Sequence, residues 1–212
     1  MESYAPMIGI CAALTVGVIS PGPSFVMIAR TAMASTRAEG VSAAIGMGMG
    51  GTLFAIAALL GLQGILLAVP ILFVALKVLG GLYLAYLGFK IWRGAASPLL
   101  ISSTSNDTAN IRTVSLRKSL LLGFTTQVSN PKTSIVYASV FAAFMPGTQS
   151  LSFNLLLLAS VFIIESGWYT IVAIALSSER PRSTYLRYKQ WLDRVAGGVM
   201  MALGVKLVVS AR

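Results

Sequence analysis

The chain has 212 residues, of which 56% are hydrophobic and only 10% charged, and its formal net charge is +10. Soluble domains carry about 25% charged residues, so this composition predicts an all-α integral membrane protein in contact with a lipid bilayer. Histidine is absent and Cys11 is the single cysteine. These counts exclude an internal disulfide, a histidine metal site and a Ser-His hydrolase, so we expect neither an enzyme nor a cofactor.

Six apolar segments are candidates to cross the bilayer, for which a helix needs about 20 residues. The expected spans are 7–28, 41–62, 71–91, 120–144, 155–176 and 195–209. The last is only about 22 Å long at 1.5 Å per residue, and it would rely on snorkelling Arg194 and Lys206 or on a thin bilayer. We expect one transmembrane domain over residues 1–212, in which 177–194 is a basic connection.

Cations gather in alternate connections between these spans. They are Arg30 and Arg37; Lys90, Arg93, Arg112, Arg117 and Lys118; and Arg180, Arg182, Arg187, Lys189 and Arg194. Because short cytoplasmic loops are enriched in lysine and arginine, these connections are predicted to be cytoplasmic and both termini periplasmic. Basic residues spread over short loops make a poor nucleic-acid surface, so no nucleic-acid partner is expected.

Two expected spans are interrupted by helix-breaking tetrapeptides, Ser20-Pro21-Gly22-Pro23 and Ser129-Asn130-Pro131-Lys132. Proline removes a backbone donor and frees a carbonyl, which inside a membrane needs protein or a wet cavity around it. Broken spans at corresponding places in two halves favour a transporter whose site lies between the half-helices. A kink that only assists packing is the alternative. The candidate substrate-binding residues are Pro21, Gly22, Pro23, Asn130, Pro131 and Lys132.

An internal repeat supports two halves. Gly81-x6-Gly88-x-Lys90 in the third span matches Gly197-x6-Gly204-x-Lys206 in the sixth without a gap. We expect three-helix repeats at about 5–95 and 116–210, joined by a polar cytoplasmic loop at about 96–115. Repeats with an odd number of spans enter the membrane from opposite sides, so the predicted fold is two inverted three-helix repeats with broken helices 1 and 4.

Glu165 lies near the middle of the fifth span, where a carboxylate is costly and usually functional. It is expected to be paired or protonated, with Lys132 as the candidate partner. Two interpretations remain open: proton coupling, and a static ion pair that locks the fourth span to the fifth. Trp168 and Tyr169 share the helical face of Glu165, so they are expected to form a wall of the site or simply to pack.

The second span contains Gly46-Met47-Gly48-Met49-Gly50-Gly51, which satisfies the G-x-G-x-x-G dinucleotide pattern. No strand is expected before it, the span is uncharged, and no acidic residue follows about twenty positions later. The same glycines allow close helix approach, and packing is the preferred interpretation.

Taken together, these motifs resemble the LysE/RhtB amino-acid exporters of bacterial inner membranes. The resemblance rests on Pro21-Gly22-Pro23, Asn130-Pro131-Lys132, the acidic residue of the fifth span and the closing Gly197-x6-Gly204. It implies efflux of a small amino-acid-like substrate in exchange for protons by a six-helix, dimeric inner-membrane carrier.

The chain departs from the family pattern at two positions. Gly51 stands where members often carry an acidic residue, and Glu165 stands where aspartate is common. If the missing carboxylate binds cationic substrates, this chain should prefer neutral ones. If it couples protons, Glu165 must do so alone.

The function expected from the sequence is secondary-active efflux of amino acids or related small metabolites, by proton antiport with alternating access. A passive channel and a non-transporting membrane scaffold are the alternatives. A thiol-disulfide carrier of similar architecture is excluded because the chain lacks a cysteine pair.

Overall fold

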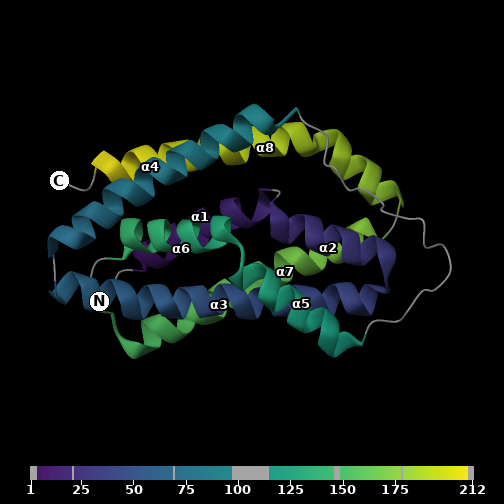
Figure 1. Cartoon of the computed structure of the whole chain (residues 1–212), viewed down its shortest axis with the longest axis horizontal. Coiled ribbons are helices and arrows are strands. Elements are labelled where there is room, and N and C mark those ends of the chain that lie inside the picture. The colour runs from purple at the N-terminus through teal and green to yellow at the C-terminus, as the bar shows by residue number, and fades with distance from the viewer. Residues whose placement is uncertain are drawn as a thin grey trace.

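The computed structural model describes residues 4–20, 22–68, 70–96, 115–145, 149–177 and 179–209. Within these ranges all regular structure is helical (Figure 1). The helices are α1 (Ala5–Ile19), α2 (Pro23–Ala34), α3 (Arg37–Ala68), α4 (Pro70–Gly94), α5 (Leu116–Val128), α6 (Pro131–Phe144), α7 (Leu151–Leu176) and α8 (Glu179–Val209). The predicted polar loop at 96–115 lies almost entirely outside the described residues.

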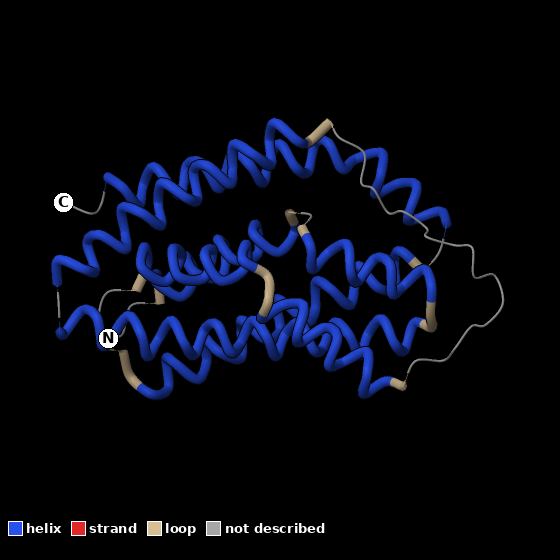
Figure 2. The backbone as a smooth tube through the Cα atoms, viewed as in Figure 1, coloured by secondary structure: helices blue, strands red, loops and turns tan. Residues whose placement is uncertain are grey.

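Both predicted breaks are present as gaps between helices. α1 ends at Ile19 and α2 begins at Pro23, with a bend of 56° between them. In the second half, α5 ends at Val128 and α6 begins at Pro131, with a short loop between them (Figure 2). The second helix of each broken pair begins with a proline, at a position where the missing N–H would have no hydrogen-bond partner within the helix. Pro21 lies outside the described residues.

The membrane spans are confirmed in part. Among the described residues, Arg37–Gly61 and Leu151–Leu176 are each long and apolar enough to cross a bilayer, and the bent pair α1–α2 is a third if it counts as one span. Each of the six expected segments is helical, the first and fourth as broken pairs. The count of six spans and their inverted arrangement remain predictions.

The expected connection at 177–194 is wrong over most of its length, because α8 begins at Glu179 and continues for 31 residues. The expected short final span is therefore the second half of a long helix. The cations of this segment favour a connection between spans, but arginine, leucine, lysine and glutamine are all good helix formers. Pro181 falls in the first turn, where proline is tolerated.

The paired glycine motifs meet where α4 and α8 lie side by side and run in opposite directions (Figure 1). A Cβ added to Gly81 would lie 2.7 Å from the Gly204 carbonyl oxygen, and one added to Gly88 would lie 2.5 Å from that of Gly197. Small residues at such positions let two backbones approach closely. The first glycine of each motif therefore faces the second glycine of the other.

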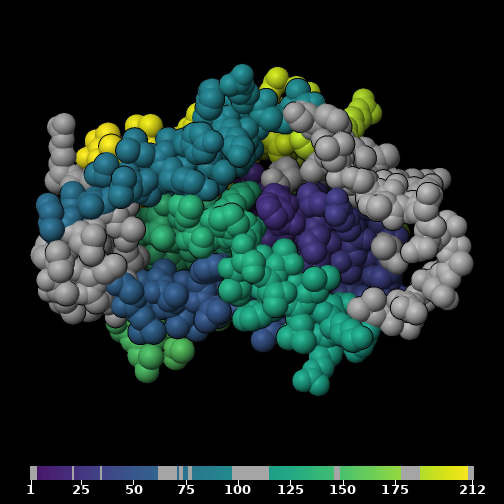
Figure 3. All heavy atoms as spheres, in the orientation of Figure 1, coloured from purple at the N-terminus to yellow at the C-terminus, as the bar shows by residue number. Residues whose placement is uncertain are grey.

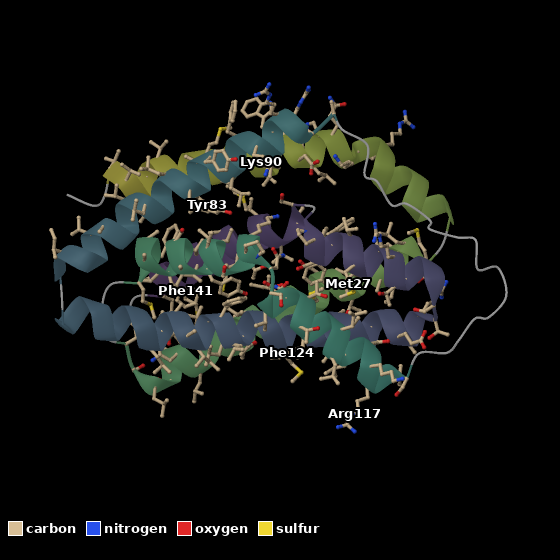
Figure 4. The ribbon with its side chains drawn as sticks, viewed as in Figure 1. Met27, Tyr83, Lys90, Arg117, Phe124 and Phe141 are labelled. Carbon is tan, nitrogen blue, oxygen red and sulfur yellow. The ribbon has the colours of Figure 1, made fainter. Side chains whose placement is uncertain are left out.

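Apolar side chains form two buried clusters, one around Tyr137 and Phe141 and the other around Phe25 and Met47. Along α7, Val161 belongs to the first cluster and Tyr169 to the second, with Glu165 between them. In Figure 4, nitrogen and oxygen atoms gather between Phe141 on α6 and Met27 on α2. The clusters therefore flank a polar centre beside the two breaks.

The outer face of α4 is apolar and exposed. It carries Leu79, Leu82, Phe89 and Trp92, each about half exposed or more, and Figure 3 shows this helix along one edge of the molecule. Such a face suits contact with lipid acyl chains, which are as apolar as leucine.

Candidate functional site

The two breaks contact each other directly through side chains. The Asn130 side chain donates from Nδ2 to Ser24 Oγ at 2.8 Å, and its Oδ1 accepts from the Lys132 backbone N–H at 3.0 Å. The Lys132 ammonium donates to the Ser20 carbonyl at 2.8 Å. Ser20 is extended, with ψ at 121°, so this carbonyl has left helical geometry. Lys132 therefore supplies the donor that the first break requires inside a membrane.

A chain of buried hydrogen bonds continues from the breaks to α7. Ser24 Oγ donates to Gln127 Oε1 at 2.6 Å, and Gln127 Nε2 donates to Glu165 Oε2 at 3.0 Å. Tyr137 donates its hydroxyl to Glu165 Oε1 at 2.8 Å. Each carboxylate oxygen thus accepts one hydrogen bond, which stabilises a group that is only 1% exposed. With Asn130 at its start, the network joins α2, α5, α6 and α7 to the second break.

The static ion pair between Lys132 and Glu165 is absent. Both residues are described, yet no ion pair within 4 Å joins them, because the ammonium is bound to Ser20 and the carboxylate to Gln127 and Tyr137. The two charges still interact electrostatically at longer range. The hydrogen bond from Tyr137, rather than an ion pair, connects α6 to α7 at this point.

These side chains surround a pocket that is partly open to the outside. Its lining is Leu14, Gly17, Val18, Ser20, Gly22, Ser24, Gln127, Asn130, Lys132, Thr133, Val136, Tyr137, Glu165 and Tyr169. The α1 residues form an apolar wall, and most of the polar groups come from the two breaks and α7. A concave, partly apolar pocket with a few convergent polar groups is typical of a small-molecule site.

The pocket carries both positively and negatively charged groups. α2 and α6 both begin beside it, and a helix N-terminus carries free N–H groups and a positive partial charge. The Lys132 ammonium lies near the same helix ends. Ser20 is 2% exposed, and its hydroxyl oxygen has no hydrogen-bond partner in the described part of the chain. This side therefore offers donors to an anionic group, while Glu165 supplies negative charge in the same pocket.

Most of the residues predicted from the sequence meet in this pocket. Gly22, Asn130, Lys132, Glu165 and Tyr169 line it, although they come from three separate segments of the chain. The paired breaks and the lone intramembrane carboxylate were the signals that identified them.

The other predicted residues lie beside the pocket or away from it. Pro23 and Pro131 are the first residues of α2 and α6 and do not line the pocket. Trp168 packs against the Phe25 cluster, and its indole N–H is buried without a hydrogen-bond partner among the described residues. Of the two alternatives expected for Trp168, the structure therefore shows packing and not a wall of this pocket. Pro21 lies outside the described residues.

Sequence reasoning missed Ser24, Gln127 and Tyr137. Gln127 is a polar residue three positions before Asn130, and Tyr137 follows Asn130 by seven residues, two turns along the same helical face. Those two spacings were visible in the sequence. The bond between Ser24 and Gln127 joins residues 103 positions apart, and it depends on how α2 packs against α5.

Comparison with known proteins identifies the family. The model of the LysE type translocator matches residues 15–211, which is nearly the whole chain. The chain belongs to the LysE family. Members of this family are translocators, so this LysE-family chain is a membrane transporter and not an enzyme, as the motifs predicted. No solved structure matches it.

Several LysE-family relatives align over most of their length. The threonine efflux protein of Escherichia coli K12 is 30% identical over 195 residues, which cover 92% of this chain and 93% of that protein. The threonine efflux protein of Salmonella typhi is 31% identical over the same shares. An uncharacterized membrane protein of Haemophilus influenzae is 27% identical over 193 residues, 91% of this chain and 90% of that protein.

Proposed function

We propose that this chain exports amino acids or closely related small metabolites across the bacterial inner membrane in exchange for protons, and that the pocket at the two breaks is its substrate site. The observation that carries the proposal is the hydrogen-bond chain from Asn130 through Ser24 and Gln127 to Glu165, around that pocket. Membership of a translocator family and similarity to threonine efflux proteins support the direction and class of transport.

A zwitterionic amino acid fits the asymmetry of the pocket. Its carboxylate would bind near the starts of α2 and α6, to the Lys132 ammonium and the Ser20 hydroxyl. An ammonium group has three donors, and one hydrogen bond is recorded for that of Lys132, which leaves donors for a substrate. The substrate ammonium would face the Glu165 carboxylate. Half-helix N-termini bind anionic substrate groups in other transporters with broken helices.

Proton coupling is assigned to Glu165. As a carboxylate it accepts hydrogen bonds from Gln127 and Tyr137; once protonated, one of its oxygens becomes a donor and these bonds must rearrange. Because Gln127, Tyr137 and Glu165 lie on α5, α6 and α7, protonation would change how these helices hold together. A bound proton can then shift the equilibrium between inward-facing and outward-facing states.

Inverted repeats would supply those two states. The glycine contacts support this architecture, since exchanging the repeat positions converts the Gly81–Gly204 contact into the Gly88–Gly197 contact. Contacts that exchange in this way are typical of two units related by a two-fold axis. Both second half-helices also begin with a proline.

In the proposed orientation, both termini of the chain lie in the periplasm.

The test uses purified protein in proteoliposomes, loaded with labelled threonine or another member of an amino-acid panel, with an imposed pH gradient. We expect saturable efflux that the gradient accelerates. The Glu165→Gln variant should lose the acceleration, whereas Ser160→Ala, elsewhere on α7, should keep it. Flux that rises linearly with concentration would favour a passive channel. Absence of flux for the whole panel, from well-folded protein, would rule out the proposed amino-acid export.

A further inference from the structure

α8 carries two buried charges that the proposed mechanism does not use. Lys189 is 8% exposed and Asp193 is 3% exposed, and the ammonium lies 2.9 Å from Asp193 Oδ2. Lys189 also donates to the carbonyl of Ala95 at 3.2 Å, just beyond the end of α4. One oxygen of the Asp193 carboxylate is therefore part of a link between α8 and α4.

The other oxygen, Asp193 Oδ1, is buried and has no hydrogen-bond partner in the described part of the chain. A buried acceptor without a donor is costly, so native proteins rarely keep one without a reason. Lys132 is the pocket cation that interacts with this carboxylate, and it interacts with Glu165 as well. The Lys132 ammonium thus lies within electrostatic range of two buried carboxylates, one on α7 and one on α8, while it is bound to Ser20.

We propose that Asp193, which lies outside the pocket lining, is a second carboxylate partner of Lys132 and positions its ammonium through the transport cycle. In the present conformation the Lys132 ammonium is held by the Ser20 carbonyl at the first break. In the opposite-facing conformation the ammonium leaves this carbonyl and donates to Asp193 Oδ1. This inference rests on the proposed transport function. It adds α8 to the elements that respond to the substrate.

The exchange of partners has a physical basis. A buried ammonium cannot leave one acceptor unless another is available, because an unpaired buried charge is strongly unfavourable. Asp193 Oδ1 is such an acceptor, and the exchange requires α6, which carries Lys132, to move relative to α8. A side chain with a different partner in each state contributes to the energy difference between two conformations of a transporter.

The competing interpretation is structural, with Asp193 serving only as the ionic partner of Lys189. A comparison of a single variant with a double variant distinguishes the two interpretations. Asp193→Asn removes the carboxylate that Lys189 binds at 2.9 Å, whereas Lys189→Met with Asp193→Asn removes both charges of the pair. If the role is structural, the double variant should recover native transport. If Asp193 serves Lys132, the double variant should stay as impaired as Asp193→Asn.

We would measure initial rates of labelled amino-acid efflux from proteoliposomes. For Asp193→Asn we expect Vmax to fall at least about tenfold while KM changes less than about twofold, because the substrate-accessible state keeps its Lys132–Ser20 bond. Asp193→Glu should recover part of the rate. Arg194→Gln, an exposed neighbour on α8, is the matched control.

Native rates for Asp193→Asn, or recovery in the double variant, would overturn this inference and leave the proposed function intact. Absence of transport by the native chain would overturn both. If Asp193→Asn does not fold, Asp193→Glu and the charge-balanced double variant carry the same comparison, with elution as a single detergent-solubilised species as the criterion for folding.

Discussion

Gly51 on α3 lies directly against Glu165 on α7. A Cβ added to Gly51 would come within 2.8 Å of both Glu165 Cγ and the Tyr137 hydroxyl. The absence of a side chain at position 51 therefore makes room for the carboxylate and its donor. The space that a side chain at position 51 would fill is thus occupied by part of Glu165.

Gly51→Ala should consequently disturb the Glu165 network. We expect it to destabilise the protein by about 1–3 kcal/mol, as overpacking commonly does, and to slow transport. Gly61→Ala, on the same helix with open space around it, is the control. Thermal unfolding in detergent and efflux rates measure the two effects, and equal behaviour of the two variants would contradict the tight contact.

Removing the Tyr137 hydroxyl should weaken the same site. Tyr137→Phe leaves Glu165 Oε1 without its donor in a buried position, which costs about 1–3 kcal/mol. Tyr86→Phe, at an exposed tyrosine on α4, removes a hydroxyl without that cost. Denaturation of both variants and the native protein gives their free energies of unfolding. Equal values for the two variants would show that the hydrogen bond from Tyr137 does not stabilise the protein.

Lys132 should determine substrate affinity. Lys132→Met removes the donor to the Ser20 carbonyl and the cation expected to bind the substrate carboxylate, so KM should rise by about tenfold or more. Lys132→Arg should recover part of this loss. Lys118→Met, at an exposed lysine on α5, should behave as native. An unchanged KM for Lys132→Met would argue that the carboxylate binds elsewhere.

The contact between α4 and α8 should depend on one of two adjacent glycines. A Cβ on Gly197 would lie 2.6 Å from the Gly88 carbonyl oxygen, whereas one on Gly198 meets nothing within 4 Å. Gly197→Ala should destabilise by about 1–3 kcal/mol, and Gly198→Ala should be neutral or slightly stabilising because alanine favours helices. Parallel thermal melts would test this, and the reverse order would refute the packing.

The sequence predicted those parts of the structure that follow from local chemistry. Proline cannot continue a helix, so both breaks were visible in the sequence, and a carboxylate in an apolar run marked Glu165. The glycine repeat predicted related helices but not that its members would face each other. Contacts such as Ser24 with Gln127 could not be predicted, because they depend on tertiary packing.

Asp193 was overlooked for a different reason. Its surroundings are rich in charge, which favours a connection between spans, although a helix can bury one charged pair and expose the rest. The structure extends α8 through this region and buries Asp193 and Lys189 together. A spacing of four residues between opposite charges is a helical signal, and it was present in the sequence.

The glycine contacts of α4 and α8 constrain how this carrier can move. At Gly81–Gly204 and Gly88–Gly197 the two backbones touch without side chains between them, so one helix cannot slide along the other without steric clashes at both places. We therefore expect α4 and α8 to move together as one rigid body. The torsional change would then concentrate at the two helix gaps, so that the residues that bind the substrate also serve as the hinges.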